Sequence, residues 1–102
     1  MCIRDRIWLD PGIGFGKTLA HNLTLTAHLN RLVEVGFPVL FGASRKRMIA
    51  GVDPTATDPG DRIGGSIALA LAAAGHGARM IRVHDVRETV QALRLQAALL
   101  PD

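Results

Sequence analysis

Several hallmarks of common protein classes are missing from this 102-residue sequence. It contains one cysteine, Cys2, and therefore no internal disulfide, which is typical of a reducing compartment. No apolar run approaches the ~20 residues that cross a bilayer. Residues 1–9 also lack the run of ~7–15 apolar residues found in a secretory signal. We therefore expect a cytoplasmic protein without a membrane partner.

Strong charge of either sign is missing as well. The formal net charge is +3, from 12 basic and 9 acidic residues, whereas a nucleic-acid-binding domain carries a concentrated basic stripe. The densest basic cluster, "SRKR" at 44–47, is more typical of a solvated loop or a site for a small anion. We expect no nucleic-acid partner. The length and the 48% hydrophobic content predict one small globular domain.

The segment "DPGIGFGKT" at 10–18 looks like a phosphate-binding loop, but its spacing does not fit one. A P-loop places four residues between its first glycine and Gly-Lys-Thr, and that first position is Pro11 here. In the dinucleotide fingerprint G-x-G-x-x-G, the third glycine would fall on Lys17. One interpretation that stays open is that the glycines at 12, 14 and 16 serve only the backbone, by allowing positive φ.

Short apolar runs alternate with helical patterns along the chain. We expect strands at 7–9, 38–44 and 79–83, the first of them buried. Helices are expected from Thr18 to a glycine cap at Gly36, over 62–77 with Asp61 as its cap, and from Asp85 onward. The order β-α-β-α-β-α predicts an α/β fold with parallel strands and right-handed crossover helices.

The expected helices differ in their apolar patterns. The first helix carries apolar residues at helical spacing: Leu25, Leu29, Leu32 and Val33. The last helix carries one apolar stripe: Val86, Val90, Leu93, Ala97 and Leu100. The helix at 62–77 is apolar nearly all round, which predicts heavy burial and suggests a subunit contact. Residues 50–61, with two prolines, are expected to form an extended loop.

Polar residues follow each expected strand. Asp10 ends the first, "GASRK" at 42–46 follows the second, and Arg82 and His84 close the third. Ligands bind at the carboxyl ends of parallel strands, so these groups are expected to share one site. Arg82 lies in an apolar strand, where a buried guanidinium needs an anionic partner. His84, two residues on, points the same way, and an Arg/His pair suits a diphosphate or carboxylate.

Simpler interpretations of these residues stay open at this point. Asp10 before Pro-Gly is a common Asx-turn residue, and Lys46 fits an ordinary solvated loop. The four histidines and the single cysteine lack metal-ligand spacing, so we expect no metal held by protein groups. Ser44 lacks the G-x-S-x-G elbow of a nucleophile, and no Ser-His-Asp site stands out.

Three blocks together resemble one known family. "LDPGIGFGKT" at 9–18, "GASRKRMI" at 42–49 and "IRVHDV" at 81–86, with "DRIGGSIALA" between the last two, resemble the carboxyl-terminal part of bacterial dihydropteroate synthase. The resemblance covers 7–102 and implies the last three βα units of a (β/α)8 TIM barrel. It implies that p-aminobenzoate is joined to 6-hydroxymethyl-7,8-dihydropterin diphosphate in folate biosynthesis, with release of pyrophosphate. Residues 1–6 do not resemble the family, and we expect a junction artefact or a spurious start there.

The resemblance also implies how the substrates bind. Asp10 is implied to accept hydrogen bonds from the aminopyrimidine edge of the pterin, and Phe15 to pack beside the aminobenzoate ring. Gly42 is implied to line the pterin pocket, where a side chain would clash. In many members a serine that holds the benzoate carboxylate follows the lysine, and here that residue is Arg47, which is able to bind the same carboxylate.

Catalysis, as implied by the resemblance, falls to Lys46, Arg82 and His84. Lys46 contacts the pterin and the reacting region, while Arg82 stacks on the pterin and holds the diphosphate together with His84. Mg²⁺ joins through the substrate diphosphate and lowers the barrier electrostatically. No protein nucleophile is required. The family usually forms homodimers.

The length sets a limit on what this chain does alone. A complete barrel needs ~250 residues, so we expect the 102-residue chain to be inactive by itself. Three alternatives remain: a methyltetrahydrofolate:corrinoid methyltransferase, which has the same fold and a pterin pocket but no diphosphate to bind; a non-catalytic synthase paralogue; and a non-enzymatic interaction protein. The motifs "SRK" and "RVHD" favour the synthase over the methyltransferase.

Overall fold

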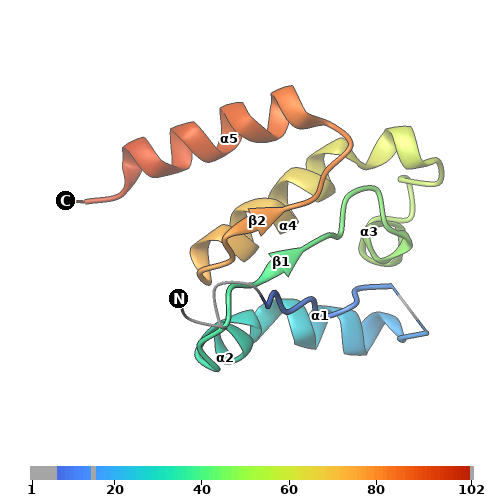
Figure 1. Cartoon of the computed structure of the whole chain (residues 1–102). Helices are drawn as coiled ribbons and strands as arrows, with labels where there is room; N and C mark the ends of the chain where they lie inside the picture. Colours follow the sequence, from blue (N-terminus) through green and yellow to red (C-terminus); the bar gives the residue numbers. More distant parts are fainter. Residues whose placement is uncertain (1–6, 15, 102) are drawn as a thin grey trace.

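Three parallel strand segments lie side by side in the computed structural model, which describes residues 7–14 and 16–101 (Figure 1). β1 (Leu40–Phe41) pairs with β2 (Met80–Ile81), residue by residue in that order. On the other side, Leu9 forms a parallel bridge with Val39, and its carbonyl accepts a hydrogen bond of 2.8 Å from the Leu40 N–H. The predicted α/β class with parallel strands is therefore confirmed.

The predicted burial of the strand at 7–9 is wrong. Ile7 and Trp8 are 43% and 41% exposed, and Leu9 makes the segment's only bridge in the part of the chain that the structure describes. An apolar run becomes a buried strand only where other elements cover it on both sides. Here β1 lies on one side of the segment, so its other edge stays open.

The first crossover contains two helices instead of one. α1 (Leu19–Ala27) begins as predicted at Thr18, whose side chain accepts a 3.2 Å hydrogen bond from the His21 N–H. The helix breaks at His28, where φ is −112°, and α2 (Leu29–Val33) follows. The predicted glycine cap is wrong, because α2 ends at Val33 with Glu34 as its C-cap, and Gly36, with φ of +104°, lies two residues beyond that cap.

The second crossover differs most from the expectation. A short helix, α3 (Arg47–Val52), occupies the start of the segment expected to be a loop, and a 3-10 turn, η2 (Pro59–Arg62), closes it. α4 (Ile63–Gly75) begins directly after η2, so Asp61 lies inside that turn and does not cap the helix. A six-residue helix is too short to show a periodic pattern, which is why the sequence did not predict α3.

The last two helices are less buried than predicted. α4 buries only Ser66, Ala70 and Ala73, although it contacts α1, α5, η2 and β2. α5 (Val86–Leu99) buries Thr89, whereas Val86 in the predicted stripe is 57% exposed. The predicted stripe therefore does not form the packed face of α5.

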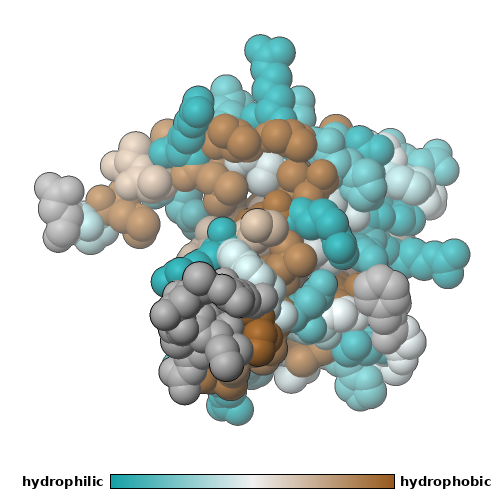
Figure 2. Space-filling view, in the orientation of Figure 1, coloured by the Kyte–Doolittle hydropathy of each residue, from teal (hydrophilic) through white to brown (hydrophobic). Residues whose placement is uncertain are grey.

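The core lies between the strands and the helices of the first two crossovers. Its largest fully buried side chains are Ile13, Leu29, Val39 and Phe41. Apolar side chains remain at the surface toward the carboxyl end of α5 (Figure 2), where Leu99 is 76% exposed. No helix of the described residues is long and apolar enough to span a membrane.

Candidate active site

Three loops meet at the carboxyl edge of the strands, on the right-hand side of Figure 1. They follow Leu9, β1 and β2, and they carry the residues expected to form the site. Because the strands are parallel, all three loops leave the sheet at the same edge. The topology therefore brings together polar groups that are far apart in sequence.

A cavity of about 150 Å³ lies between the loops after β1 and β2. The residues that line it are Gly42, Ser44, Lys46, Arg82, Val83 and His84. Four of the six residues expected at the site are among them, and Ser44 is an addition. None of the lining residues is acidic, so the cavity offers cations and hydrogen-bond donors and is suited to an anion.

The guanidinium of Arg82 lies directly over Gly42. A Cβ atom at Gly42 would lie 2.9 Å from Arg82 Nη2 and 3.1 Å from Nε, so the absence of a side chain makes room for this group. Arg82 is exposed, which corrects the predicted buried guanidinium, because β2 ends at Ile81 and Arg82 lies beyond it. No carboxylate pairs with Arg82 within residues 7–14 and 16–101.

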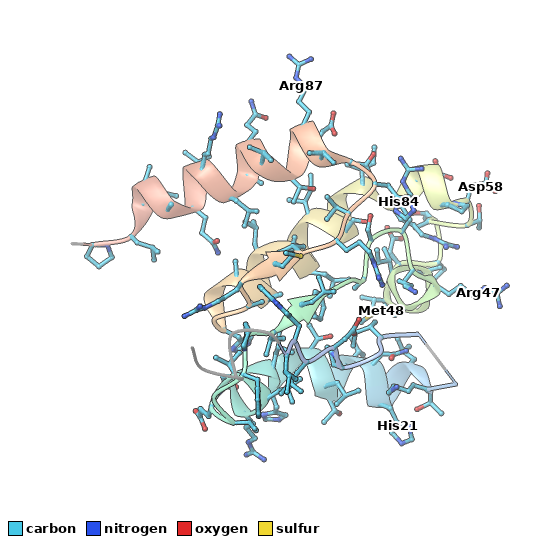
Figure 3. The ribbon with its side chains drawn as sticks, viewed as in Figure 1. His21, Arg47, Met48, Asp58, His84 and Arg87 are labelled. Atoms are coloured by element: carbon cyan, nitrogen blue, oxygen red, sulfur yellow. The ribbon has the colours of Figure 1, made fainter. Side chains whose placement is uncertain are left out.

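Ser44 holds His84 by two contacts. The His84 backbone N–H donates to Ser44 Oγ at 3.1 Å, and the Nδ1 atom of the ring lies 3.0 Å from the same oxygen. Figure 3 shows His84 at the turn that leads from β2 into α5. Sequence reasoning set Ser44 aside because it lacks a nucleophile elbow, and the 40-residue separation from His84 hides the contact.

Arg45, in the loop after β1, is held by contacts with Arg62, Ser66 and Asp85. Its φ of +56° lies in the left-handed region that a side chain seldom adopts. Its N–H donates to Ser66 Oγ at 2.7 Å, and its carbonyl accepts from Arg62 Nη1 at 3.1 Å. Its guanidinium pairs with Asp85 through two hydrogen bonds of 2.7 and 3.2 Å. These contacts fix the backbone between Ser44 and Lys46.

The Asp85 carboxylate therefore does not cap α5 as predicted. Asp85 occupies the N-cap position, but its side chain pairs with Arg45, and its carbonyl accepts a 2.7 Å hydrogen bond from the Thr89 hydroxyl. The hydrogen bond from Arg45 lowers the pKa of the Asp85 carboxyl, and the same hydrogen bond raises the pKa of Arg45. The loops after β1 and β2 are thus tied together by charge.

The glycine loop lies against Lys46. A Cβ atom at Gly14 would lie 3.3 Å from Lys46 Cδ, so the loop passes beside this side chain. The predicted positive φ is confirmed at all three glycines, with values of 69°, 87° and 64° at 12, 14 and 16. Asn22 accepts a 3.0 Å hydrogen bond from the Gly14 N–H, and the Lys17 ammonium donates to the Gly12 carbonyl at 2.9 Å.

A second cavity, of about 610 Å³, opens beyond Lys46. Its polar lining is mostly basic, and Arg47 extends from it away from the body of the protein (Figure 3). The basic residues around it are Lys17, Arg45, Lys46, Arg47 and Arg62. Arg62 donates its guanidinium hydrogens to backbone carbonyls and is 7% exposed, so it holds the loop together. Lys46 lines both cavities and links them.

Two expected residues are not among the described lining of either cavity. The Asp10 carboxylate accepts a 2.7 Å hydrogen bond from the Gly12 N–H, which is the Asx-turn interpretation, and its side chain is exposed. Phe15 lies outside the described residues. Within the described ranges, no three His, Cys, Asp or Glu residues lie close enough to hold a metal ion.

Comparison with known proteins identifies the family of this chain. The sequence matches the pterin binding enzyme family over residues 2–84. The chain belongs to this family. The chain is 54% identical over 96 residues to a dihydropteroate synthase of Neisseria meningitidis serogroup C. It is 46% identical over 97 residues to that of Escherichia coli K12.

Solved structures show the same similarity. The dihydropteroate synthase of Xanthomonas albilineans in complex with 7,8-dihydropteroate superimposes with a TM-score of 0.89, at 49% identity over 94% of this chain. That of Thermus thermophilus in complex with 4-aminobenzoate gives 0.87, at 48% identity over 91% of this chain. The chain spans about a third of the length of its relatives, 34% of both curated ones.

Proposed function

We propose that this chain is the carboxyl-terminal part of a dihydropteroate synthase and forms the last three βα units of its (β/α)8 barrel. The whole enzyme would condense p-aminobenzoate with 6-hydroxymethyl-7,8-dihydropterin diphosphate. The observation that carries the proposal is the acid-free cavity in which Arg82, His84 and Lys46 converge, in a chain 54% identical to a synthase. The single cysteine supports a cytoplasmic location.

In this reaction the bond between the pterin methylene carbon and the diphosphate oxygen breaks, and its electron pair leaves with the diphosphate. The amine nitrogen of p-aminobenzoate then bonds to that carbon and loses a proton. Negative charge grows on the leaving group, so cations and hydrogen-bond donors placed beforehand around it lower the barrier. Arg82 and His84 supply these groups at the rim of the cavity, and no nucleophile of the protein is needed.

The remaining residues take the substrate-binding roles. Gly42 leaves room for the Arg82 guanidinium, so that its face can stack on the pterin. Lys46 lines both cavities and is proposed to contact the pterin and the reacting region. Asp10 is proposed to accept from the pterin amine, and Phe15 to pack on the aminobenzoate ring. Arg47, at the mouth of the larger cavity, is proposed to bind the aminobenzoate carboxylate.

A Mg²⁺ site made by this chain does not fit the residues at the cavity. Mg²⁺ takes oxygen ligands, mainly carboxylates and phosphates, whereas the smaller cavity is lined by two cations, a histidine and a serine. No step of the proposed reaction passes through the metal. Any Mg²⁺ of the whole enzyme would be held by the substrate diphosphate or by the rest of the barrel.

We also propose that the whole enzyme is a homodimer. α4 supports this, because it is apolar along most of its length and yet buries only three of its side chains within this chain. An apolar helix face that stays exposed is a common subunit contact.

Binding of the pterin diphosphate tests the proposed function directly. The experiment uses a hybrid in which this chain replaces the matching third of the Neisseria meningitidis relative. We expect Arg82→Met to weaken pterin diphosphate binding about 10- to 100-fold by calorimetry, since hydrogen bonds to charged groups contribute about 1.5–3 kcal/mol. Binding of the pterin without diphosphate should change much less.

Equal loss for both ligands would contradict the assignment of Arg82 to the diphosphate. Failure of a folded hybrid to bind either ligand would favour a non-enzymatic interaction protein. A hybrid that binds the pterin but gains nothing from the diphosphate would favour the methyltransferase alternative, whose ligand carries no diphosphate.

A further inference from the structure

The Ser44 hydroxyl oxygen contacts both the backbone and the imidazole ring of His84. His84 N lies 3.1 Å from Ser44 Oγ and His84 Nδ1 lies 3.0 Å from it. Ser44 is 8% exposed, so little water reaches this oxygen. The two contacts fix the imidazole ring relative to its own backbone.

The single proton of the Ser44 hydroxyl bears on which atom donates in the contact between Ser44 Oγ and His84 Nδ1. A hydroxyl has one proton and two acceptor lone pairs. The backbone N–H of His84 is only a donor, so it takes one lone pair and leaves the hydroxyl proton to be placed. Nδ1 of His84 lies within hydrogen-bond distance and can accept that proton. A hydrogen on Nδ1 would instead occupy the second lone pair of Ser44 Oγ and leave the hydroxyl proton with no acceptor among the described contacts. The geometry therefore favours donation from the Ser44 hydroxyl to an Nδ1 that carries no hydrogen.

We propose that Ser44 is a positioning residue that holds neutral His84 as the tautomer with its hydrogen on Nε2. The ring then presents an N–H donor to the cavity, next to the cations of Arg82 and Lys46. With the other tautomer, a bare nitrogen lone pair would face a bound anion and repel it. The assignment to a diphosphate oxygen rests on the proposed function, whereas the tautomer itself does not.

The charged groups around His84 are consistent with this role. Lys46 and Arg82 line the same cavity, and Asp85 follows His84 with its carboxylate turned to Arg45. No carboxylate among the described residues accepts a hydrogen from the imidazole, so Ser44 is the partner that sets the ring. A neutral N–H donor at this point would give a bound anion a directional hydrogen bond, in addition to its attraction to the two positive charges.

Nitrogen NMR of the 102-residue chain, labelled with ¹⁵N-histidine, tests the tautomer without any activity. At about pH 8.5, above the ordinary imidazole pKa of about 6.5, His84 should show an acceptor-type Nδ1 and a protonated Nε2. Ser44→Ala should shift both resonances toward the tautomer mixture of the exposed His21 in the same spectrum. Ser44→Thr keeps the hydroxyl and should restore the wild-type pattern.

Two further variants make the result specific. His84→Gln assigns the resonances, and Thr26→Val, which removes a buried hydroxyl bonded within α1, should leave the His84 pattern unchanged. Where Ser44→Ala does not fold, the wild-type and Ser44→Thr spectra still decide. A hydrogen on Nδ1 in either would overturn the proposal, and so would an unchanged pattern in folded Ser44→Ala.

Inorganic pyrophosphate as a probe separates this proposal from the proposed function. Its addition should move the Nε2 and Nε2–H resonances of His84 most, if the donor faces a diphosphate. A correct tautomer with no response to pyrophosphate would support the role of Ser44 on the ring and contradict the role toward the anion. A response to pyrophosphate together with a hydrogen on Nδ1 would contradict the proposed tautomer and still support an anion site at His84.

Discussion

At the scale of single residues, the site depends on a glycine and a serine as much as on its cations. Gly42 makes the space that the Arg82 guanidinium fills, and Ser44 fixes the ring of His84. Neither residue carries charge, yet each sets where a charged or polar group lies. Catalysis by electrostatic stabilisation depends on such fixed placement, because misplaced groups must reorganise during the reaction.

Gly42→Ala should displace Arg82 without unfolding the protein. The new Cβ would meet Arg82 Nη2 at 2.9 Å, and the guanidinium is the mobile end of a flexible side chain. We expect kcat/KM of the hybrid synthase to fall about 10- to 100-fold, since misplacement by ~1 Å can cost about 10²-fold. Gly60→Ala is the matched control, because no atom lies within 4 Å of its added Cβ. Equal activity of the two variants would show that the position of Arg82 is unimportant.

The Arg45–Asp85 pair should make stability depend on pH in one direction. The folded state lowers the pKa of the Asp85 carboxyl below its ordinary 3.8. Its stabilisation is therefore fully present above pH 3.8, and it is lost as pH falls through the lower folded value. The difference in Tm between wild type and Asp85→Asn should be positive near neutral pH and should vanish at low pH. It should also shrink in about 1 M salt. A difference that is independent of both pH and salt would contradict the pair.

Much of the site was predictable residue by residue, but its connections were not. Strand order alone predicts that Gly42, Lys46, Arg82 and His84 meet at one edge. The contacts of Ser44 with His84 and of Arg45 with Asp85 each span 40 residues, and a local sequence pattern does not predict a partner so far along the chain. Asp85 illustrates the difference, since local preference indicates a helix cap and a distant guanidinium takes the carboxylate instead.

At the scale of elements, the alternation of parallel strands and crossover helices follows from the sequence, while the break at His28, the short helix α3 and the burial of each face do not. The Thr18 cap is a local property and is confirmed, whereas α2 ends with its C-cap at Glu34, before the predicted Gly36 cap. Burial depends on which neighbour covers a face, so the exposed strand before Leu9 was not predictable. α5 packs on α4 through Thr89 and through Gln96, whose amide donates to the Leu71 carbonyl, so polar residues form part of its inner face.

Two neighbouring glycines of α4 should respond oppositely to alanine. A Cβ at Gly65 would overlap Ile49 Cγ2 on α3 and lie 3.0 Å from its Cγ1, so Gly65→Ala should cost about 1–3 kcal/mol of unfolding free energy. A Cβ at Gly64 meets no atom within 4 Å, and alanine is the better helix former by about 1 kcal/mol. Urea unfolding should therefore place the two variants on opposite sides of wild type. Changes of the same sign would contradict the packing of α3 against α4.

At the scale of the whole molecule, the described chain leaves surface for further structure to cover. The segment before Leu9 pairs on one side only, and β2 pairs only with β1 within the described residues. Apolar side chains of α5 also stay exposed, including Leu95 at 62%, and Leu100 just beyond its end is 65% exposed. The relatives are about three times as long. These features support the proposal that the chain is one part of a larger barrel.

The 102-residue chain alone should therefore show no synthase turnover. The proposed diphosphate groups lie in this chain, but the other strands and loops of a complete barrel, which would complete the site, are contributed by the rest of the enzyme. An assay of the purified chain with pterin diphosphate and p-aminobenzoate should give dihydropteroate no faster than a buffer blank. Turnover above the blank, abolished by Arg82→Met, would contradict this prediction.

Product formation by the hybrid with the Neisseria meningitidis relative tests the central claim most directly. We predict dihydropteroate and pyrophosphate in equal amounts, with a loss of about 10²-fold or more in kcat when Arg82→Met removes one group that stabilises the leaving anion. A hybrid that folds as the relative does and yet makes neither product would contradict the assignment of this chain to the synthase. Unchanged turnover in Arg82→Met would contradict the role assigned to the cavity.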